Sequence, residues 1–361
     1  MSNKVYNYSA GPATLPEQVL DICKKELLDW RGSGISVMEM NHRGENFGEI
    51  LQDAKQSVKT LLNVPDTHEI LFVQGGATAQ FSAVPLNLIG KTGKADYIVS
   101  GNFSEIAAAE AEKYGKVSIA ASTKPFNYTR VPVASDIRLS DNSSYLHYCS
   151  NNTVFGTAFS YVPEAGTLPL VCDMSSDIMS KPIDVAKYGL IYAGAQKNMA
   201  PAGVTMLILR KDILGNELNI TPRQMSYKLF ADSDSLLNTP PCWCIYMLGL
   251  VMHWVSDNGG VSGMAELKKE RSAVIYDVLD NSKFYAPFAE KDSRSDINIT
   301  FRTPSAEKDS EFVKEAASKG LICLAGHKKA GGLRASLYNA MTIQGAKVLA
   351  EFMKEFEVRN V

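Results

Sequence analysis

The chain has 361 residues, of which 45% are hydrophobic and 21% are charged, and its formal net charge is -2. This composition is that of an ordinary globular protein and excludes a disordered or fibrous chain. The charge is too close to zero to provide a broad binding surface for nucleic acid or for an anionic membrane, so neither partner is expected.

The N-terminal residues contain no continuous apolar stretch of the kind found in a secretory signal. The longest apolar stretch, 242–255, is too short to span a bilayer and is expected to be a buried helix. The six cysteines form no C-x-x-C pair, which predicts reduced packing residues, a cytoplasmic protein and no metal site. These cysteines are Cys23, Cys149, Cys172, Cys242, Cys244 and Cys323.

The first part of the chain predicts an irregular arm followed by two helices. Residues 1–16 include glycine, two prolines and small polar residues, and Pro16 suits the first turn of a helix. Apolar residues recur at helical spacing over 17–30, until Arg31 and glycines break the pattern. A polar loop containing His42 and Arg43 precedes a second amphipathic helix, predicted over 47–62.

The middle of the chain alternates short apolar runs with helical segments, predicted over 78–88, 105–114 and 184–188. This pattern predicts an α/β fold with a mainly parallel seven-stranded sheet covered on both faces. Ligands bind at the carboxyl ends of the strands in such sheets. The predicted strands are 70–73, 97–100, 117–120, 145–149, 170–173, 190–193 and 205–209.

The pattern changes after the prolines at 240 and 241, where two long helices are predicted, over 242–257 and 262–280. The remaining strands and helices predict a smaller α+β unit. They are strands at 297–302, 321–324 and 333–337, and helices at 305–319 and 342–356. We therefore predict a large domain at 17–258 and a small domain at 259–361, with the arm at 1–16 associated with the small domain.

Residues 192–204 place one lysine, Lys197, among small residues directly after an apolar run. Small neighbours let a planar group approach the backbone closely. A lysine in a partly dry pocket has a lowered pKa and can attack a carbonyl group, which makes Lys197 a candidate Schiff-base lysine. The alternative is an ordinary lysine at the end of a strand.

Two further motifs follow predicted strands. Residues 74–80, which include Ala77 and Thr78, open a helix, so their backbone amides could hold an anion; the alternative is a simple tight turn. Asp173 ends an apolar run and could pair with a protonated ring nitrogen; the alternative is a cap for the following segment. A lysine, a carboxylate and a phosphate loop at neighbouring strand ends form the set of groups that pyridoxal phosphate requires.

Many motifs in the same order resemble the phosphoserine aminotransferases, a class V, fold-type-I family of pyridoxal-phosphate enzymes in serine biosynthesis. They occur nearly end to end and read SAGPATLP, MNHRG, QGGATAQFSAVPLNL, AEKYG, YCSNNTVFGT, DMSSD, GAQKNMAPAG, NTPPCWCIYMLGL and AGHKKAGGLRASLYNAM. The resemblance implies reversible transamination of O-phospho-L-serine with 2-oxoglutarate, giving 3-phosphohydroxypyruvate and L-glutamate. Alternatives are use of 4-phosphohydroxy-L-threonine, a serine-glyoxylate aminotransferase, a desulfurase, or a non-catalytic protein of the same fold.

The resemblance also implies roles for individual residues around the cofactor. Lys197 would form the Schiff base and move the substrate α-proton, and Asp173 would pair with the pyridinium nitrogen. The cofactor phosphate would be held by Ala77, Thr78 and Gln196, joined by Asn238 and Thr239 from the second subunit of a homodimer. Thr153 would contact the ring substituents, and Phe103 would stack on the ring.

For the substrate, the resemblance assigns the α-carboxylate to Arg334 with the backbone near Ala10. His42 and Arg43 from the second subunit, with His327, would receive the substrate phosphate or the distal carboxylate of glutamate. Three positions depart from some relatives: Phe103 stands in place of tryptophan, Thr78 in place of arginine, and Lys328 in place of arginine. The first two changes predict a weaker hold on the cofactor.

Overall fold

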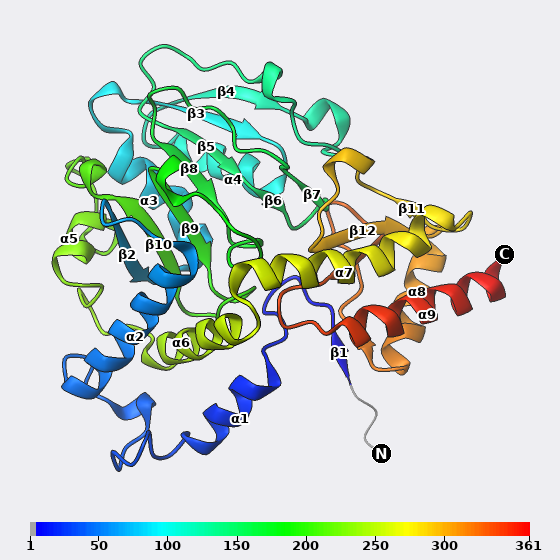
Figure 1. Ribbon diagram of the computed structural model, residues 1–361. Coiled ribbons are helices and arrows are strands. Elements are labelled where there is room, and N and C mark those ends of the chain that lie inside the picture. The colour runs from blue at the N-terminus through cyan, green and yellow to red at the C-terminus, as the bar shows by residue number, and fades with distance from the viewer. Residues whose placement is uncertain (1–4) are drawn as a thin grey trace.

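The computed structural model describes residues 5–361 and is built on one seven-stranded sheet (Figure 1). Its strand order is β2-β10-β9-β8-β5-β3-β4, and all neighbours are parallel except β10, which runs antiparallel to both β2 and β9. All seven predicted strands and the mainly parallel sheet are confirmed. The strands are β2 (His68–Val73), β3 (Lys94–Val99), β4 (Lys116–Ser122), β5 (Leu146–Cys149), β8 (Leu170–Asp173), β9 (Leu190–Gly194) and β10 (Thr205–Arg210).

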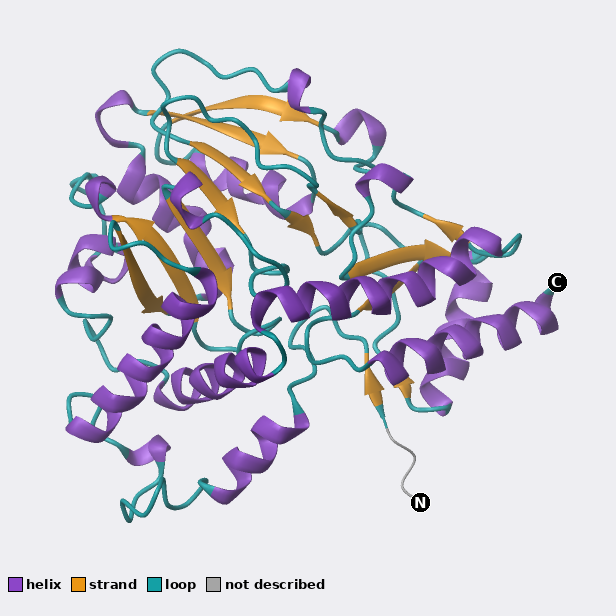
Figure 2. Cartoon of the chain, in the orientation of Figure 1, coloured by secondary structure: helices purple, strands orange, loops and turns teal. Residues whose placement is uncertain are grey.

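Helices cover both faces of this sheet (Figure 2). Successive strand residues point to opposite faces, so Ile191 of β9 joins the core with α2 (Glu45–Leu62) and α6 (Cys242–Asp257). Tyr192, the next residue, joins the core with α3 (Gly76–Leu88) and α4 (Asn102–Ala111). Burial on both faces explains why these strands read as continuous apolar runs in the sequence.

The C-terminal part has a hydrophobic core of its own. The long helix α7 (Gly260–Asn281) runs from the sheet into this part (Figure 1). A small sheet in the order β11-β12-β14 packs there with two further helices. The elements are β11 (Ala286–Pro287), β12 (Asn298–Arg302), α8 (Ala306–Ser318), β13 (Leu321–Ile322), β14 (Leu333–Ser336) and α9 (Ile343–Asn360).

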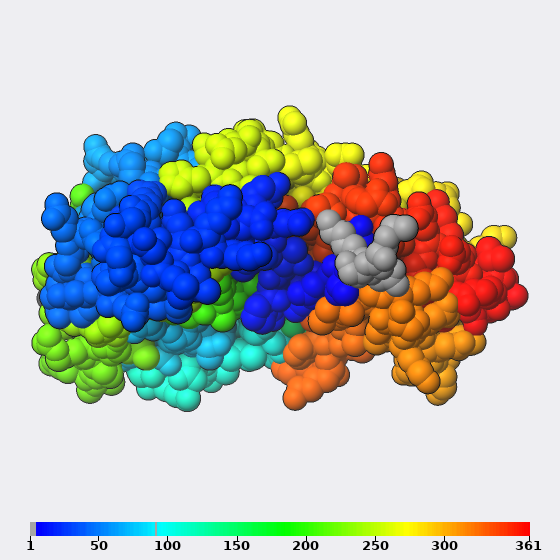
Figure 3. Space-filling model, turned by 90° about the horizontal axis from the view of Figure 1, so that it is seen from below, coloured from blue at the N-terminus to red at the C-terminus, as the bar shows by residue number. Residues whose placement is uncertain are grey.

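The N-terminal arm meets this C-terminal part. Strand β1 (Tyr6–Asn7) pairs in parallel with β13, and the Tyr338 hydroxyl donates to the carbonyl of Ala10 at 2.8 Å. In Figure 3 the dark blue start of the chain lies against the orange and red C-terminal residues. The separate core and this pairing support the predicted division into 1–16, 17–258 and 259–361, which we retain as a proposal.

Two predicted helices differ from the structure. Helix α1 (Glu17–Lys25) ends before the predicted residue 30, and Leu20 and Leu27 of its predicted apolar face are 45% and 40% exposed. The chain then folds into a turn in which the amide of Trp30 donates to the carbonyl of Ile35. The predicted helix at 184–188 is only a 3₁₀ turn, because the Asp184 side chain accepts from the amide of Ala186 and the chain continues extended.

Several elements of two to six residues were not predicted, because segments this short carry no clear periodic pattern. They are β6 (Asn151–Asn152), β7 (Thr157–Ala158), α5 (Tyr227–Asp232) and the 3₁₀ turns Val37–Glu39, Gly90–Thr92, Lys124–Phe126, Ala134–Asp136, Lys211–Ile213, Arg223–Met225 and Lys291–Ser293.

All six cysteines are free thiols. The expectation that they pack in the interior is wrong for Cys323, which is exposed and has a positive φ of 66° directly after β13. Within residues 5–361, no helix combines the length and the apolar character that a membrane crossing requires. The same residues contain no group of three or more side chains that could hold a metal ion.

The C-terminal core depends on Phe312, which is fully buried among Tyr285, Phe301, Phe352 and Phe356. We expect Phe312→Ala to lower the free energy of unfolding by about 3–5 kcal/mol, because the surrounding rings cannot collapse into the cavity. Urea denaturation followed by circular dichroism measures this loss. The control Phe126→Ala removes a ring that is 46% exposed and should cost less than about 1 kcal/mol. Equal losses would contradict the prediction.

Candidate active site

A tight turn after β9 positions Lys197. The amide of Ala195 donates to the carbonyl of Val204, and the amides of Met199 and Ala200 both donate to the carbonyl of Ala195. The N-terminal arm closes over this turn, since a Cβ built on Gly11 would lie 3.3 Å from Cγ of Lys197. The Lys197 ammonium donates to Oγ1 of Thr153 at 2.9 Å.

The carboxylate of Asp173 lies at the end of β8, the strand next to β9. Asp173 is 8% exposed and lies opposite Tyr192 in the register of the two strands. The amide of Ser175 donates to Oδ1 of Asp173 at 2.9 Å, and the Ser175 hydroxyl accepts from the amide of Gly194 at 3.0 Å. Asp173 therefore caps the following turn, which was the alternative to a cofactor contact in the sequence analysis. Its charge also acts on Lys197.

Burial shifts both ionisable groups toward their neutral forms. Desolvation lowers the pKa of Lys197, the negative charge of Asp173 opposes this shift, and the positive charge of Arg334 adds to it. Desolvation raises the pKa of Asp173, while the charge of Lys197 and the hydrogen bond from Ser175 lower it. A lysine with a lowered pKa has a larger neutral fraction near pH 7 and is a better nucleophile and base.

Thr153 joins the lysine to the predicted carboxylate clamp. The Arg334 guanidinium, on β14, donates through Nη1 to the carbonyl of Thr153 at 3.1 Å. Its Nε is buried without a hydrogen-bond partner in the described chain. Arg334 thus retains an unused donor beside the lysine, as a site that receives an anion requires.

One wall of the site is aromatic. Phe103 lies in the first turn of α4, and the centre of its ring is 5.6 Å from Nζ of Lys197. Gly101, directly before α4, packs closely against Asn152. A Cβ built on Gly101 would lie 2.2 Å from Oδ1 of Asn152. Glycine at 101 therefore allows the start of α4 to approach the strand end and present Phe103 to the lysine.

The predicted phosphate loop follows β2. Gly75, with φ 94°, is the N-cap of α3, and no side chain caps its first amides. A Cβ at Gly76 would meet nothing within 4 Å, so space remains in front of Ala77 and Thr78. Uncapped amides at the start of a 13-residue helix bind an anionic group favourably.

Asn238 and Thr239 lie near this loop in the same chain. The Asn238 amide donates to Oε1 of Gln74 at 2.8 Å, and the Gln74 amide donates to the carbonyl of Thr239 at 3.3 Å. Oδ1 of Asn238 is buried without a partner in the described residues. Gln196 precedes Lys197, and its carbonyl accepts from the amide of Ala13 at 2.9 Å.

The predicted substrate residues divide into two groups. His327 lies near Arg334. Burial is the largest cause that lowers the pKa of His327, and the positive charge of Arg334 is the second. His42 and Arg43 instead lie in the turn before α2, and no hydrogen bond or ion pair in residues 5–361 joins them to Lys197. Burial and the charge of Arg43 lower the pKa of His42.

These residues fit pyridoxal phosphate. The donor set provides a lysine amine, a buried carboxylate, an aromatic wall and an uncapped helix N-terminus, which match the carbonyl, ring nitrogen, ring face and phosphate of that cofactor. Sequence reasoning assigned no separate role to Ser175, whose amide donates to Asp173, to Asn152, which packs against Gly101, or to Tyr338, whose hydroxyl donates to the carbonyl of Ala10. Only the flanking motifs DMSSD, YCSNNT and SLYNAM pointed to them.

The electrostatic coupling predicts opposite effects of two substitutions on the cofactor-free protein. Asp173→Asn should lower the pKa of Lys197 further, because a negative charge is lost, whereas Arg334→Ala should raise it. The measurement is the pH dependence of Lys197 modification by trinitrobenzenesulfonate, quantified by peptide mass spectrometry. Shifts in the same direction for both variants would contradict the prediction, and exposed Lys187 provides the internal reference.

Comparison with known proteins gives the same assignment along the whole chain. The aminotransferase class-V family model matches residues 5–349. The phosphoserine aminotransferase of Pseudomonas fluorescens is 46% identical over 357 residues, covering 99% of both chains, and that of Lysinibacillus sphaericus is 45% identical over 361 residues, covering 100% of both.

Solved structures agree. Phosphoserine aminotransferase from Bacillus circulans subsp. alkalophilus has a TM-score of 0.98 at 40% identity, with 100% of both chains covered. The pyridoxal-phosphate-bound enzyme of Trichomonas vaginalis has a TM-score of 0.94 at 36% identity, covering 97% of this chain and 100% of that one. The chain therefore belongs to the phosphoserine aminotransferase family of class-V aminotransferases, which are pyridoxal-phosphate-dependent enzymes.

Proposed function

We propose that this enzyme transfers an amino group reversibly between O-phospho-L-serine and 2-oxoglutarate, giving 3-phosphohydroxypyruvate and L-glutamate in serine biosynthesis. The observation that carries the proposal is the shared contact of Lys197 and Arg334 with Thr153, which supports a base and a carboxylate clamp acting side by side. The names of relatives about 45% identical over the whole chain support this substrate.

Pyridoxal phosphate, when bound, supplies a carbonyl that condenses with amines and a ring that withdraws electrons from the substrate α-carbon. Asp173 would keep the ring nitrogen protonated, and Phe103 would pack on the ring face. The amides of Ala77 and Thr78 would hold the phosphate, with Gln196. Asn238 and Thr239 of a second subunit would complete this phosphate site in a homodimer.

Lys197 would act as the base that removes the α-proton and returns it. Its lowered pKa keeps more of the amine neutral at physiological pH, so Nζ can accept a proton. Arg334 would bind the α-carboxylate through its planar fork, beside the backbone of Ala10. This contact would fix the α-carbon within reach of the amine.

The substrate phosphate, or the distal carboxylate of glutamate, would bind His327 with His42 and Arg43 of the second subunit. Lys328 would add charge there without the fork geometry of arginine. The same site would also accept 4-phosphohydroxy-L-threonine, which carries the same phosphate. The principal alternative is a serine-glyoxylate aminotransferase, for which a phosphate site would serve no purpose.

A coupled assay with 2-oxoglutarate compares phosphoserine with serine as amino donor. We expect phosphoserine to be used at least about 100-fold more efficiently, because a site built to pair an anion leaves charged groups unpaired without it. His327→Ala should reduce kcat/KM for phosphoserine about tenfold or more and leave that for serine nearly unchanged. Arg334→Ala should reduce both. Equal efficiency for the two donors would favour the alternative function.

The shared site predicts complementation between two defective subunits. Lys197→Ala should abolish turnover, and Arg43→Ala should weaken phosphoserine binding, so each homodimer is impaired. Mixed in equal amounts after reversible dissociation, they should recover about a quarter of wild-type activity, since half the dimers are mixed and each has one intact site. Activity no higher than the average of the two separate variants would show that Arg43 serves its own subunit.

A further inference from the structure

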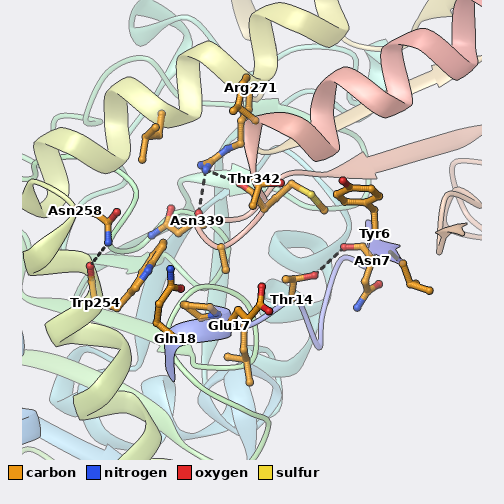
Figure 4. A pocket seen from close by; sticks show the side chains of 17 residues that line it. Tyr6, Asn7, Thr14, Glu17, Gln18, Trp254, Asn258, Arg271, Asn339 and Thr342 are labelled. Atoms are coloured by element: carbon orange, nitrogen blue, oxygen red, sulfur yellow. Dashed lines mark hydrogen bonds between the residues drawn. The ribbon is translucent and has the colours of Figure 1, made fainter. Parts of the chain in front are cut away.

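A cavity lies between the N-terminal arm, the junction of α6 and α7, and the loop before α9 (Figure 4). Its volume is about 340 Å³, and neither Lys197 nor Arg334 lines it. Polar side chains from three separate parts of the chain face it. They are Asn7, Thr14, Glu17 and Gln18 from the arm and α1, Asn258 and Arg271 from the helices, and Asn339 and Thr342 from the loop.

Arg271 lines this cavity and has buried hydrogen-bond donors without a partner among the described residues. It is 2% exposed, and its guanidinium extends from α7 toward Asn339 and Thr342 (Figure 4). Nη1 donates to the carbonyls of Asn339 at 2.9 Å and Met341 at 2.8 Å. Nε and Nη2, which form the other edge of the guanidinium, are buried and have no partner among the described residues.

The charge of Arg271 is also unbalanced. No ion pair of the described chain includes it, and the acidic group that acts on it is Glu270 of its own helix. Burial lowers the pKa of its guanidinium to about 10, which leaves it positively charged at neutral pH. A buried cation without a counter-ion is costly, and proteins rarely keep one unless an anion balances it.

We propose that this cavity binds a small monocarboxylate, whose two oxygens accept hydrogen bonds from Nε and Nη2 of Arg271. The two donors on one edge of a guanidinium match the spacing of the two oxygens of a carboxylate. A single buried cation balances one negative charge, and Glu17 on the cavity wall disfavours a dianion such as phosphate. The amides of Gln18 and Asn258 and the ring of Trp254 surround the remaining space for the body of the ligand.

This site is separate from the substrate clamp but is linked to it through the backbone. The loop that Arg271 holds includes Asn339, whose amide donates to Oδ1 of Asn198 at 3.0 Å. Asn198 directly follows Lys197. A carboxylate on Arg271 would therefore contact a segment that also supports the catalytic lysine.

The test is calorimetric titration of the holoenzyme with propionate. The enzyme carries Arg334→Ala, which removes the proposed clamp for the substrate α-carboxylate, and the Arg271 variant below distinguishes the cavity from any remaining active-site binding. We expect one propionate per chain and binding at least about tenfold weaker when Arg271→Lys is added, because lysine keeps the charge but lacks the two-donor edge. Lys269→Ala, on the exposed side of the same helix, should leave the affinity unchanged, and inorganic phosphate should bind more weakly than propionate.

A crystal of the holoenzyme soaked with 3-bromopropionate provides a measurement that does not depend on the folding of a variant. The anomalous signal of bromine should lie in this cavity, with the carboxylate on Nε and Nη2 of Arg271. Undiminished propionate affinity in the Arg271→Lys enzyme would overturn the proposal. So would the absence of binding to the Arg334→Ala enzyme, or a bromine signal only at other places.

Discussion

The site depends on two opposite charges that the fold holds at adjacent strand ends in a partly dry environment. Burial lowers the pKa of Lys197 and raises that of Asp173, and the charge of each residue opposes the shift of the other. Thr153 completes this balance, because its hydroxyl accepts from Lys197 while its carbonyl accepts from Arg334. The parallel pairing of β8 with β9 therefore sets the protonation of the lysine as well as its position.

Sequence patterns alone predicted the sheet, Lys197, Asp173 and the phosphate loop, whereas Phe103, Thr153 and Arg334 were assigned to the site only through the family resemblance. Strands buried on both faces produce apolar runs that are hard to mistake, and β2, β8 and β9 lead directly to the phosphate loop, Asp173 and the turn of Lys197. Helix α1 forms but ends at Lys25 instead of residue 30, and Leu20 and Leu27 of its predicted apolar face remain exposed in a single chain. Spacing shows that a face is apolar but does not show what covers it.

Other parts of the site could not be predicted because they depend on contacts between distant segments. Gly11 and Lys197 are far apart in sequence, and only the closing of the arm over the turn brings them together. The unused edge of Arg271 gives no sequence signal, since an arginine on a helix is ordinarily solvated. The roles of His42, Arg43, Asn238 and Thr239 also came from family resemblance, and no hydrogen bond or ion pair of the described residues joins the first two to Lys197.

The pairing of β1 with β13 has a mechanical consequence. The arm is fastened at one end to the C-terminal part by this strand pair and by the hydroxyl of Tyr338. At its other end it touches the lysine turn, where the amide of Ala13 donates to the carbonyl of Gln196. If the C-terminal part rotates against the sheet, the arm would move with it and displace the turn that carries Lys197. Arg334, which lies on β14 of the C-terminal part, and Lys197 would therefore change position in one movement.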